Sequence, residues 1–166
     1  MKLQDVLYKV GIRSVAGKTD IEVKDIQIDS RKIKPGSVFV AVRGVAADGH
    51  QFIEKAIENG AAVIVCEVLP AEVKDKVIYI QVENSAAAAA LMATNFFGKP
   101  SERVKLVGVT GTNGKTTIAT LLYKLFTRLG YTCGLISTVE NRIGEKVLPA
   151  THTTPDAISL NQLLKQ

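Results

Sequence analysis

The segment Thr110–Thr117 has the residue types and spacing of a loop that binds the phosphates of a nucleotide. It reads Thr-Gly-Thr-Asn-Gly-Lys-Thr-Thr and lies between an apolar run, 104–109, and an amphipathic stretch that begins at Ile118. Glycines let several backbone N–H groups converge on an anion, and a helix N-terminus adds positive potential. In such a loop Lys115 would reach the outer phosphates, and the Thr116 hydroxyl would be a ligand of Mg²⁺. The loop by itself indicates a nucleoside triphosphate without identifying the reaction.

One position departs from the general pattern of such loops. The pattern places a glycine five residues before Gly114. This sequence has Val109 there, with Gly108 and Gly111 close by. The alternative interpretation is an ordinary turn between a strand and a helix, but the Gly-Lys-Thr order directly before an amphipathic helix favours phosphate binding.

The elements around the loop predict a parallel β-α-β unit. The run 104–109 has the composition of a buried strand, and the stretch after the loop carries its leucines at helical spacing up to Gly130. Tyr131–Ile136 is the next expected strand, so strand, helix and strand in this order imply a right-handed parallel unit. One such unit is too little for a complete doubly wound sheet, so we expect a truncated start of a parallel-sheet domain.

Two more elements are expected towards the end of the chain. Thr138–Val147, with Gly144 inside it, predicts a short hairpin. Thr154-Pro155-Asp156 is typical of the N-cap, first residue and acidic first turn of a helix, which would run on through Leu160 and Leu164.

The residues before the loop predict a separate small α/β domain. A helical stretch at 3–10 is followed by extended runs and helices, with Gly98–Arg103 as a polar linker. We therefore expect residues 1–98 to form one domain, 99–103 a linker and 104–166 the start of a second domain. The extended runs are Asp25–Ile28, Val38–Val42, Ala62–Cys66 and Val77–Val82, and the helices are 52–57 and Asn84–Phe97.

Composition limits the classes of partner. The chain has 166 residues, 46% of them hydrophobic and 22% charged, which is the mix of a folded globular protein. Its net charge of +5 suits a phosphorylated ligand, but the basic residues are scattered and only 5% of the residues are aromatic. Nucleic acid is therefore not an expected partner. No apolar run approaches the ~20 residues that cross a bilayer. Met1–Asp5 shows no secretory signal, so a cytoplasmic location is expected.

The two cysteines predict no metal or redox site. Cys66 and Cys133 each lie in a strand-like run without a second cysteine or a histidine at metal-binding spacing. Two buried free thiols are expected, which suits a reducing compartment.

Five segments, in the same order along the chain, resemble the muramyl-peptide ligases, the Mur ligase family of peptidoglycan synthesis. Two lie in the first domain: Asp29-Ser30-Arg31, and Pro35–Ala41 continued by Gly44 and Asp48-Gly49-His50. Gly111–Thr117 is similar to the family's ATP loop. Gly134–Asn141 and His152–Asp156 are similar to the members that attach the third amino acid of the peptide. The resemblance covers the whole chain.

The resemblance implies binding residues for each substrate. ATP and Mg²⁺ would be held by the loop, with Lys115 acting on the transferred phosphoryl group and Thr116 binding the metal. Arg31 and Lys32 would add charge beside Ser30. Read from the residues alone, Asp48-Gly49 is a turn with His50 at a helix start, so a structural role is expected for His50. The loop residues are Gly111, Thr112, Asn113, Gly114, Lys115, Thr116 and Thr117, and the precursor would contact Ile28, Ser30, Val45, Ala46, Ala47, His152, Thr153 and Thr154.

Two of these assignments carry a qualification from the sequence. Val45, Ala46 and Ala47 are apolar, so their contacts with the uridine would run through backbone groups. The family's usual asparagine before the paired threonines is His152 here.

The reaction implied by the resemblance is ATP-dependent amide ligation. The γ-phosphate of ATP would activate a carboxylate of UDP-MurNAc-L-Ala-D-Glu as an acyl phosphate, which the amine of L-lysine or meso-diaminopimelate would attack. The alternatives are a sister ligase that adds D-Ala-D-Ala, an unrelated P-loop kinase or nucleotide switch, and a non-catalytic nucleotide-sugar-binding module. We expect the complete ligase to be a monomer and this chain to be a part that is inert alone.

Overall fold

The computed structural model describes residues 1–44, 47–149 and 155–166. It divides into two compact units, Met1–Gly98 and Lys99–Gln166, which are called unit 1 and unit 2 below. Both units combine helices with a sheet, so the predicted α/β class is confirmed. Within the described residues, no helix is both long enough and apolar enough to cross a membrane.

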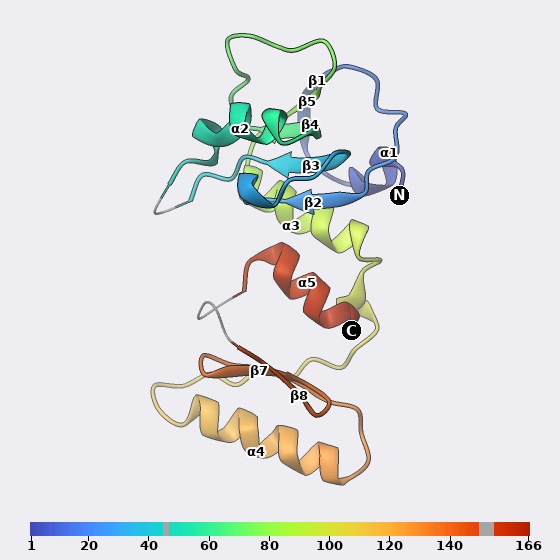
Figure 1. Ribbon diagram of the computed structural model, residues 1–166. Helices are drawn as coiled ribbons and strands as arrows, with labels where there is room; N and C mark the ends of the chain where they lie inside the picture. Colours follow the sequence, from blue (N-terminus) through green and yellow to red (C-terminus); the bar gives the residue numbers. More distant parts are fainter. Residues whose placement is uncertain (45–46, 150–154) are drawn as a thin grey trace. The chain divides into compact units, whose positions relative to one another are not determined.

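Unit 1 is built on a five-stranded sheet with the strand order β1-β5-β4-β3-β2 (Figure 1). Strands β2 to β5 are parallel, whereas β1 pairs antiparallel with β5 at one edge. The carboxyl ends of parallel strands meet at one edge of a sheet, so the segments that follow β2, β3 and β4 lie on the same edge. The strands are β1 Ile12–Ala16, β2 Asp25–Gln27, β3 Ser37–Val40, β4 Ala61–Cys66 and β5 Ile78–Val82.

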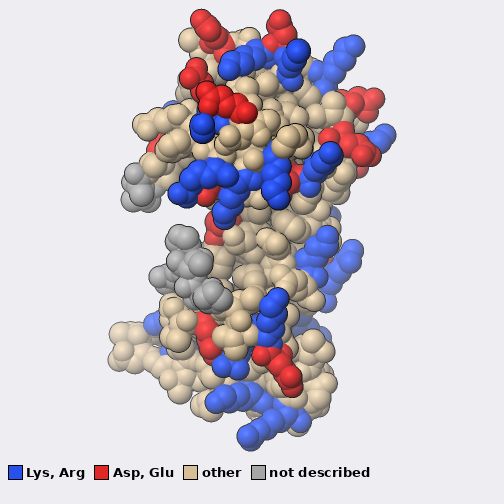
Figure 2. Space-filling view, in the orientation of Figure 1, with Lys and Arg blue, Asp and Glu red and all other residues tan. Residues whose placement is uncertain are grey.

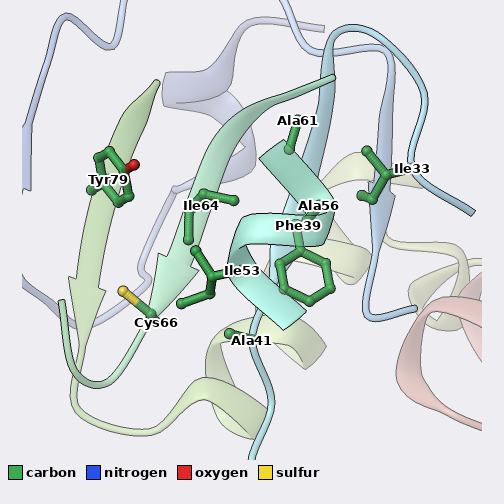
Figure 3. Packing of buried hydrophobic residues seen from close by; sticks show 9 residues of the cluster. All are labelled: Ile33, Phe39, Ala41, Ile53, Ala56, Ala61, Ile64, Cys66 and Tyr79. Carbon is green, nitrogen blue, oxygen red and sulfur yellow. The ribbon is translucent and has the colours of Figure 1, made fainter. Parts of the chain in front are cut away.

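The central strands consist mostly of apolar residues, which suits a sheet covered by helices on both faces. All four residues of β3 are buried, and so is most of β4. On one face, Ile53 of helix α2 (Ile53–Glu58) joins Phe39, Ile64 and Tyr79 in a buried cluster (Figure 3). Helices α1 (Leu3–Val6) and α3 (Ser85–Phe96) lie on the other side of the sheet (Figure 1).

Local sequence explains where the helices of unit 1 begin and end. The N-cap of α3 is Asn84, whose Oδ1 accepts a hydrogen bond from the Ala87 N–H at 2.9 Å. A 3₁₀ helix, η2 (Gly49–Phe52), leads into α2. Helix α2 ends just before Gly60, whose φ of +97° suits glycine, as the sequence predicts.

Strand β1 is the element of unit 1 that the sequence does not predict. All five of its residues are exposed, so it lacks the alternation of apolar and polar residues that marks a half-buried strand. It owes its conformation to pairing with β5, which is a contact between distant parts of the chain.

Unit 2 contains a long helix, α4 (Lys115–Arg128), an antiparallel sheet of order β6-β7-β8, and a last helix, α5 (Ala157–Lys165). Strands β7 and β8 form the predicted hairpin, with Gly144 in its turn. A short 3₁₀ helix, η3 (Pro100–Glu102), lies in the segment expected to be a linker. The strands are β6 Gly134–Ile136, β7 Glu140–Ile143 and β8 Lys146–Pro149.

The prediction of a parallel β-α-β arrangement in unit 2 is wrong. Residues 104–109 form no strand, and β6 pairs antiparallel with β7. A strand forms only by pairing with a neighbour. No part of residues 99–149 or 155–166 pairs with 104–109, where Leu106 and Val107 are 67% and 69% exposed.

Two smaller expectations also need correction. The N-cap of α5 is Asp156 rather than Thr154, because the Asp156 carboxylate accepts the N–H groups of Ile158 and Ser159 at 2.9 Å each. Cys66 is buried, and burial raises the pKa of its thiol to about 11. Cys133 is only half-buried, and it lies directly before β6.

Candidate functional site

The glycine-rich loop of unit 2 leads directly into α4. Gly114 is the N-cap of this helix with φ +78°, and Gly111 has φ +151°, so both lie in the region that residues with a side chain rarely adopt. The Gly114 carbonyl accepts the N–H of Ile118 at 2.9 Å, which is a first-turn hydrogen bond of the helix. The two glycines therefore allow the sharp entry into the helix that a phosphate loop requires.

The loop offers several donors at the head of α4. The N–H groups of residues 111–114 have no hydrogen-bond acceptor within the part of the chain that the structure describes, and these residues are exposed. Lys115 Nζ donates to the carbonyl oxygens of Gly111 and Thr112, at 2.5 and 3.1 Å, so its ammonium group lies beside the loop. The positive end of the helix dipole adds to this potential. The chemistry of these groups therefore fits the phosphates of a nucleotide.

Thr116 supplies a hydroxyl next to Lys115. The residue is half-buried, and its hydroxyl makes no hydrogen bond to any described residue. Thr127, in the last turns of the same helix, instead donates to the Tyr123 carbonyl at 2.8 Å. A free hydroxyl oxygen is a hard ligand that suits Mg²⁺. Residues 1–44, 47–149 and 155–166 contain no cluster of three His, Cys, Asp or Glu side chains that would hold a metal by themselves.

In unit 1, the segment after β2 forms a short 3₁₀ helix, η1 (Ser30–Lys32), capped by Asp29. The Asp29 carboxylate accepts the Arg31 N–H at 3.0 Å and binds the Arg31 guanidinium through two hydrogen bonds of 2.9 Å. These bonds lower the pKa of the Asp29 carboxyl. Figure 2 shows Lys and Arg side chains gathered over this part of unit 1. The charge of Arg31, expected to be available to a ligand, is thus paired with Asp29, although the side chains of both Arg31 and Lys32 are exposed.

Ser30 combines a fixed backbone with an unused hydroxyl. The residue is 7% exposed, and its carbonyl accepts a hydrogen bond from Asn59 Nδ2 at 2.8 Å. Its hydroxyl has no partner among the described residues. Ile28, two residues earlier, is half-buried. Ser30 therefore remains able to bind a polar group at the carboxyl edge of the sheet.

The described residues on either side of 45–46 contact each other. The Gly44 N–H donates to the Ala47 carbonyl at 3.0 Å, and Arg43 and Asp48 form an isolated antiparallel bridge. Ala47 is exposed. The other predicted precursor contacts, Val45, Ala46, His152, Thr153 and Thr154, lie outside the described residues.

His50 connects Asp48 to Glu67, the residue that follows β4. Its Nδ1 lies 2.6 Å from Asp48 Oδ1, and its Nε2 accepts the Glu67 N–H at 2.9 Å. Because Nε2 accepts, the proton is assigned to Nδ1, which donates to Asp48. Both ring nitrogens are used, which supports the structural role predicted for this histidine.

The sequence did not single out Glu67, whose N–H donates to His50, or Arg43 and Ser85, which bind the Glu67 carboxylate. Glu67 directly follows β4, and Ser85 is the first residue of α3. A signal was present, because polar residues that follow parallel strands meet at the same edge of the sheet. Using that signal requires the strand order, which the sequence does not state.

The carboxylates of this edge predict how unit 1 responds to acid. Hydrogen bonds from His50 lower the pKa of the Asp48 carboxyl, and hydrogen bonds from Ser85 lower that of Glu67. A carboxyl with a lower pKa in the folded state stabilises the fold above its unfolded pKa, and this is lost as the pH falls through the folded pKa. We expect the urea midpoint of unfolding to decrease between about pH 5 and about pH 3. Glu67→Gln should make that decrease smaller.

The matched control is Glu83→Gln, which removes an exposed carboxylate from the end of β5. It should leave the pH dependence as it is in the unaltered chain. A midpoint that does not change over this pH range would contradict the prediction.

The structure defines an α/β protein of two units, the second with a glycine-rich loop at the head of a helix. Two family models match the chain: "Mur ligase family, catalytic domain" over residues 22–97, and "Mur ligase middle domain" over residues 109–166. The chain belongs to the Mur ligase family.

Curated relatives match almost the whole chain. It is 58% identical over 165 residues to the UDP-N-acetylmuramoyl-L-alanyl-D-glutamate–2,6-diaminopimelate ligase of Cytophaga hutchinsonii, and 50% identical over 164 residues to the ligase of the same name from Phocaeicola vulgatus. Each match covers 99% of this chain and 34% of the relative. The chain thus spans about a third of the length of these relatives.

Solved structures give the same fold. A structure of a UDP-N-acetylmuramoyl-L-alanyl-D-glutamate–2,6-diaminopimelate ligase superimposes with a TM-score of 0.73 at 25% identity, covering 99% of this chain and 33% of that one. A MurF structure from Acinetobacter baumannii has a TM-score of 0.63 at 20% identity, covering 99% and 32%, and is alike in fold alone.

Proposed function

We propose that this chain carries the precursor-binding unit and the ATP loop of a MurE-type ligase of peptidoglycan synthesis. Such a ligase joins meso-diaminopimelate to UDP-MurNAc-L-Ala-D-Glu. The observation that carries the proposal is the 58% identity, over 165 residues, to the diaminopimelate ligase of Cytophaga hutchinsonii. The names of the relatives favour diaminopimelate as the added amino acid over L-lysine, and over the D-Ala-D-Ala that the sister ligase adds.

The two units have separate tasks in this proposal. Residues 1–98 bind the uridine end of the precursor through Ile28, Ser30, Val45, Ala46 and Ala47. Residues 99–103 connect them to residues 104–166, which begin the ATP-binding domain. His152, Thr153 and Thr154 contact the peptide part of the precursor. The location is the cytoplasm, and the complete ligase acts as a monomer.

The chemistry requires activation of a carboxylate, which is a poor electrophile. ATP supplies the γ-phosphoryl group: a carboxylate oxygen of the precursor attacks the γ-phosphorus, ADP leaves, and the amine then attacks the acyl phosphate, losing a proton as phosphate departs. This chain's part in the first step is positioning and neutralisation of charge.

Lys115 and the loop supply that neutralisation. The N–H groups of residues 111–114 have no acceptor within the described chain, so they can donate hydrogen bonds to phosphate oxygens without breaking other bonds. The ammonium of Lys115 exchanges its two carbonyl partners for a phosphate oxygen. The Thr116 hydroxyl is the ligand that this loop offers to Mg²⁺.

The proposal is tested by phosphate release from a polypeptide of the full family length that begins with this chain. With ATP, Mg²⁺ and UDP-MurNAc-L-Ala-D-Glu, release is expected with meso-diaminopimelate and not with L-lysine. Release that requires the tripeptide precursor and D-Ala-D-Ala would show the sister activity instead. Transfer of phosphate to a stable acceptor would show a kinase.

A further inference from the structure

The segment that carries Ser30, η1, is too short to hold its conformation alone. It has three residues, and the hydrogen bonds of its backbone run from the Lys32 N–H to the Asp29 carbonyl at 3.0 Å and from the Ile33 N–H to the Ser30 carbonyl at 3.4 Å. A single turn of this kind is marginal in water, because fixing its dihedral angles costs more conformational entropy than its few hydrogen bonds offset. The geometry of η1 therefore depends on contacts with the rest of unit 1.

Asn59 makes such a contact from the end of helix α2. Its Nδ2 donates to the Ser30 carbonyl at 2.8 Å, although the two residues are far apart in the sequence. The orientation of the amide follows from its partner, since a carbonyl oxygen can only accept and must therefore face the NH₂ group. Within the part of the chain that the structure describes, no other residue outside 29–33 forms a hydrogen bond with the backbone of η1.

The backbone of Asn59 is itself held in place. Its N–H donates within the last turn of α2 at 3.1 Å, and the carbonyl of the next residue, Gly60, accepts the Gly36 N–H at 3.2 Å. Ile33, which follows η1, is buried in the same cluster as Ala56 of α2 (Figure 3). The Asn59 amide thus extends from a fixed helix end to a short segment that packs against the same helix.

Among the described residues, Asn141 Oδ1 is the one buried side-chain oxygen or nitrogen without a partner, so the unpaired Ser30 hydroxyl is in contact with solvent. We infer that Asn59 is a positioning residue for Ser30, because it fixes the backbone from which this hydroxyl reaches the uridine end of the precursor. The inference rests on the proposed function, which assigns Ser30 to that ligand. A group that is fixed before binding loses less conformational freedom when the ligand arrives, so the affinity is higher.

The test is binding of UDP-MurNAc-L-Ala-D-Glu to the 166-residue chain, measured by calorimetry well below the unfolding temperature. Ser30→Ala removes the hydroxyl that would contact the ligand and should weaken binding about fivefold, as expected for the loss of one hydrogen bond. Asn59→Ala removes the amide that fixes the Ser30 carbonyl. It should weaken binding about threefold, which is less than the effect of Ser30→Ala because Asn59 acts only through Ser30.

Asn95→Ala is the matched control, because Asn95 is also a half-buried asparagine of unit 1 whose Nδ2 donates to backbone carbonyls. Its partners are the Val6 and Tyr8 carbonyls, at 3.0 and 2.8 Å, and it belongs to α3, on the other side of the sheet from α2 (Figure 1). The control loses the same kind of hydrogen bond and should bind the precursor as the unaltered chain does. Equal weakening by Asn95→Ala and Asn59→Ala would show a general loss of stability and overturn the inference.

A double-variant cycle shows whether Asn59 acts through Ser30. If it does, Asn59→Ala combined with Ser30→Ala should bind no more weakly than Ser30→Ala alone. Additive losses, or equal affinity of Asn59→Ala and the unaltered chain, would overturn the inference and leave the proposed function standing. No binding by the unaltered chain, or full affinity of Ser30→Ala, would overturn the assignment of the uridine end to Ser30, and with it the inference.

A variant that fails to fold is recognised by circular dichroism. In that case Asn59→Asp replaces Asn59→Ala, because it keeps the shape of the side chain, while its carboxylate at neutral pH has no proton to donate to the Ser30 carbonyl. Weaker precursor binding by the folded Asn59→Asp chain is expected, and unchanged binding would again overturn the inference.

Discussion

Lys115→Ala is expected to lower the kcat of the complete ligase by about 10²-fold or more, which is the usual cost of losing one preorganised electrostatic donor. The ammonium group already lies beside the loop, bonded to the carbonyls of Gly111 and Thr112, so it needs little movement to reach a phosphate oxygen. Alanine keeps the helix, because it is the strongest helix former, and removes only the charge. Steady-state phosphate release measures the effect.

The control for this variant lies on the same helix. Lys124→Ala removes an exposed lysine more than two turns further along α4, so the net charge changes equally. Its turnover should match that of the unaltered enzyme. Near-normal turnover of Lys115→Ala would contradict the assignment of this loop to the transferred phosphoryl group.

Gly49→Ala is expected to destabilise unit 1 by about 2–3 kcal/mol, the upper part of the range for overpacking a close-packed site. A Cβ atom at Gly49 would lie 2.7 Å from both the N and the O of Val42 and 2.9 Å from the carbonyl carbon of Ala41. These are backbone atoms of the segment after β3, which the Gly49 N–H also binds through the Val42 carbonyl at 2.9 Å. For a unit of this size the melting temperature should fall by about 10–20 °C, as circular dichroism would show.

Gly11→Ala is the matched control, because a Cβ there meets nothing within 4 Å. It lies in the same unit, and its melting temperature should stay the same or rise slightly. Equal melting temperatures for the two variants would show that the close approach at Gly49 is relieved by a small backbone shift.

Most elements of unit 1 could be predicted because their signals are local. The apolar runs of β3, β4 and β5 are buried on both faces, and Gly60 and Asn84 mark the ends of helices by their own backbone and side-chain chemistry. Strand β1 and the failed strand at 104–109 show the limit of this reasoning. Pairing decides whether a segment is a strand, and pairing partners are distant in the sequence.

The residues of the candidate site were predictable only where they are contiguous in the sequence. The loop 111–117 is contiguous, so its glycines, lysine and threonine could be recognised together. Arg43, Glu67 and Ser85 come from the segments that follow β3, β4 and β5, and only the strand order β5-β4-β3 and the position of α3 bring them to one place. The pairing of Arg31 with Asp29 was also missed, because an Asp-Ser-Arg sequence does not reveal which way the guanidinium turns.

The pairing of β1 with β5 has a consequence for folding while the chain is being synthesised on the ribosome. Ile12 pairs with Val82, so the first strand made must wait for the last strand of its sheet. At a synthesis rate of about 5–20 residues per second, roughly 3–12 seconds separate the two strands. During that time Ile12–Ala16 is an unpaired segment of a nascent chain, while β2, β3 and β4 can already assemble as neighbours. Slowing translation before β5 should therefore lengthen the interval in which a chaperone can bind the N-terminus.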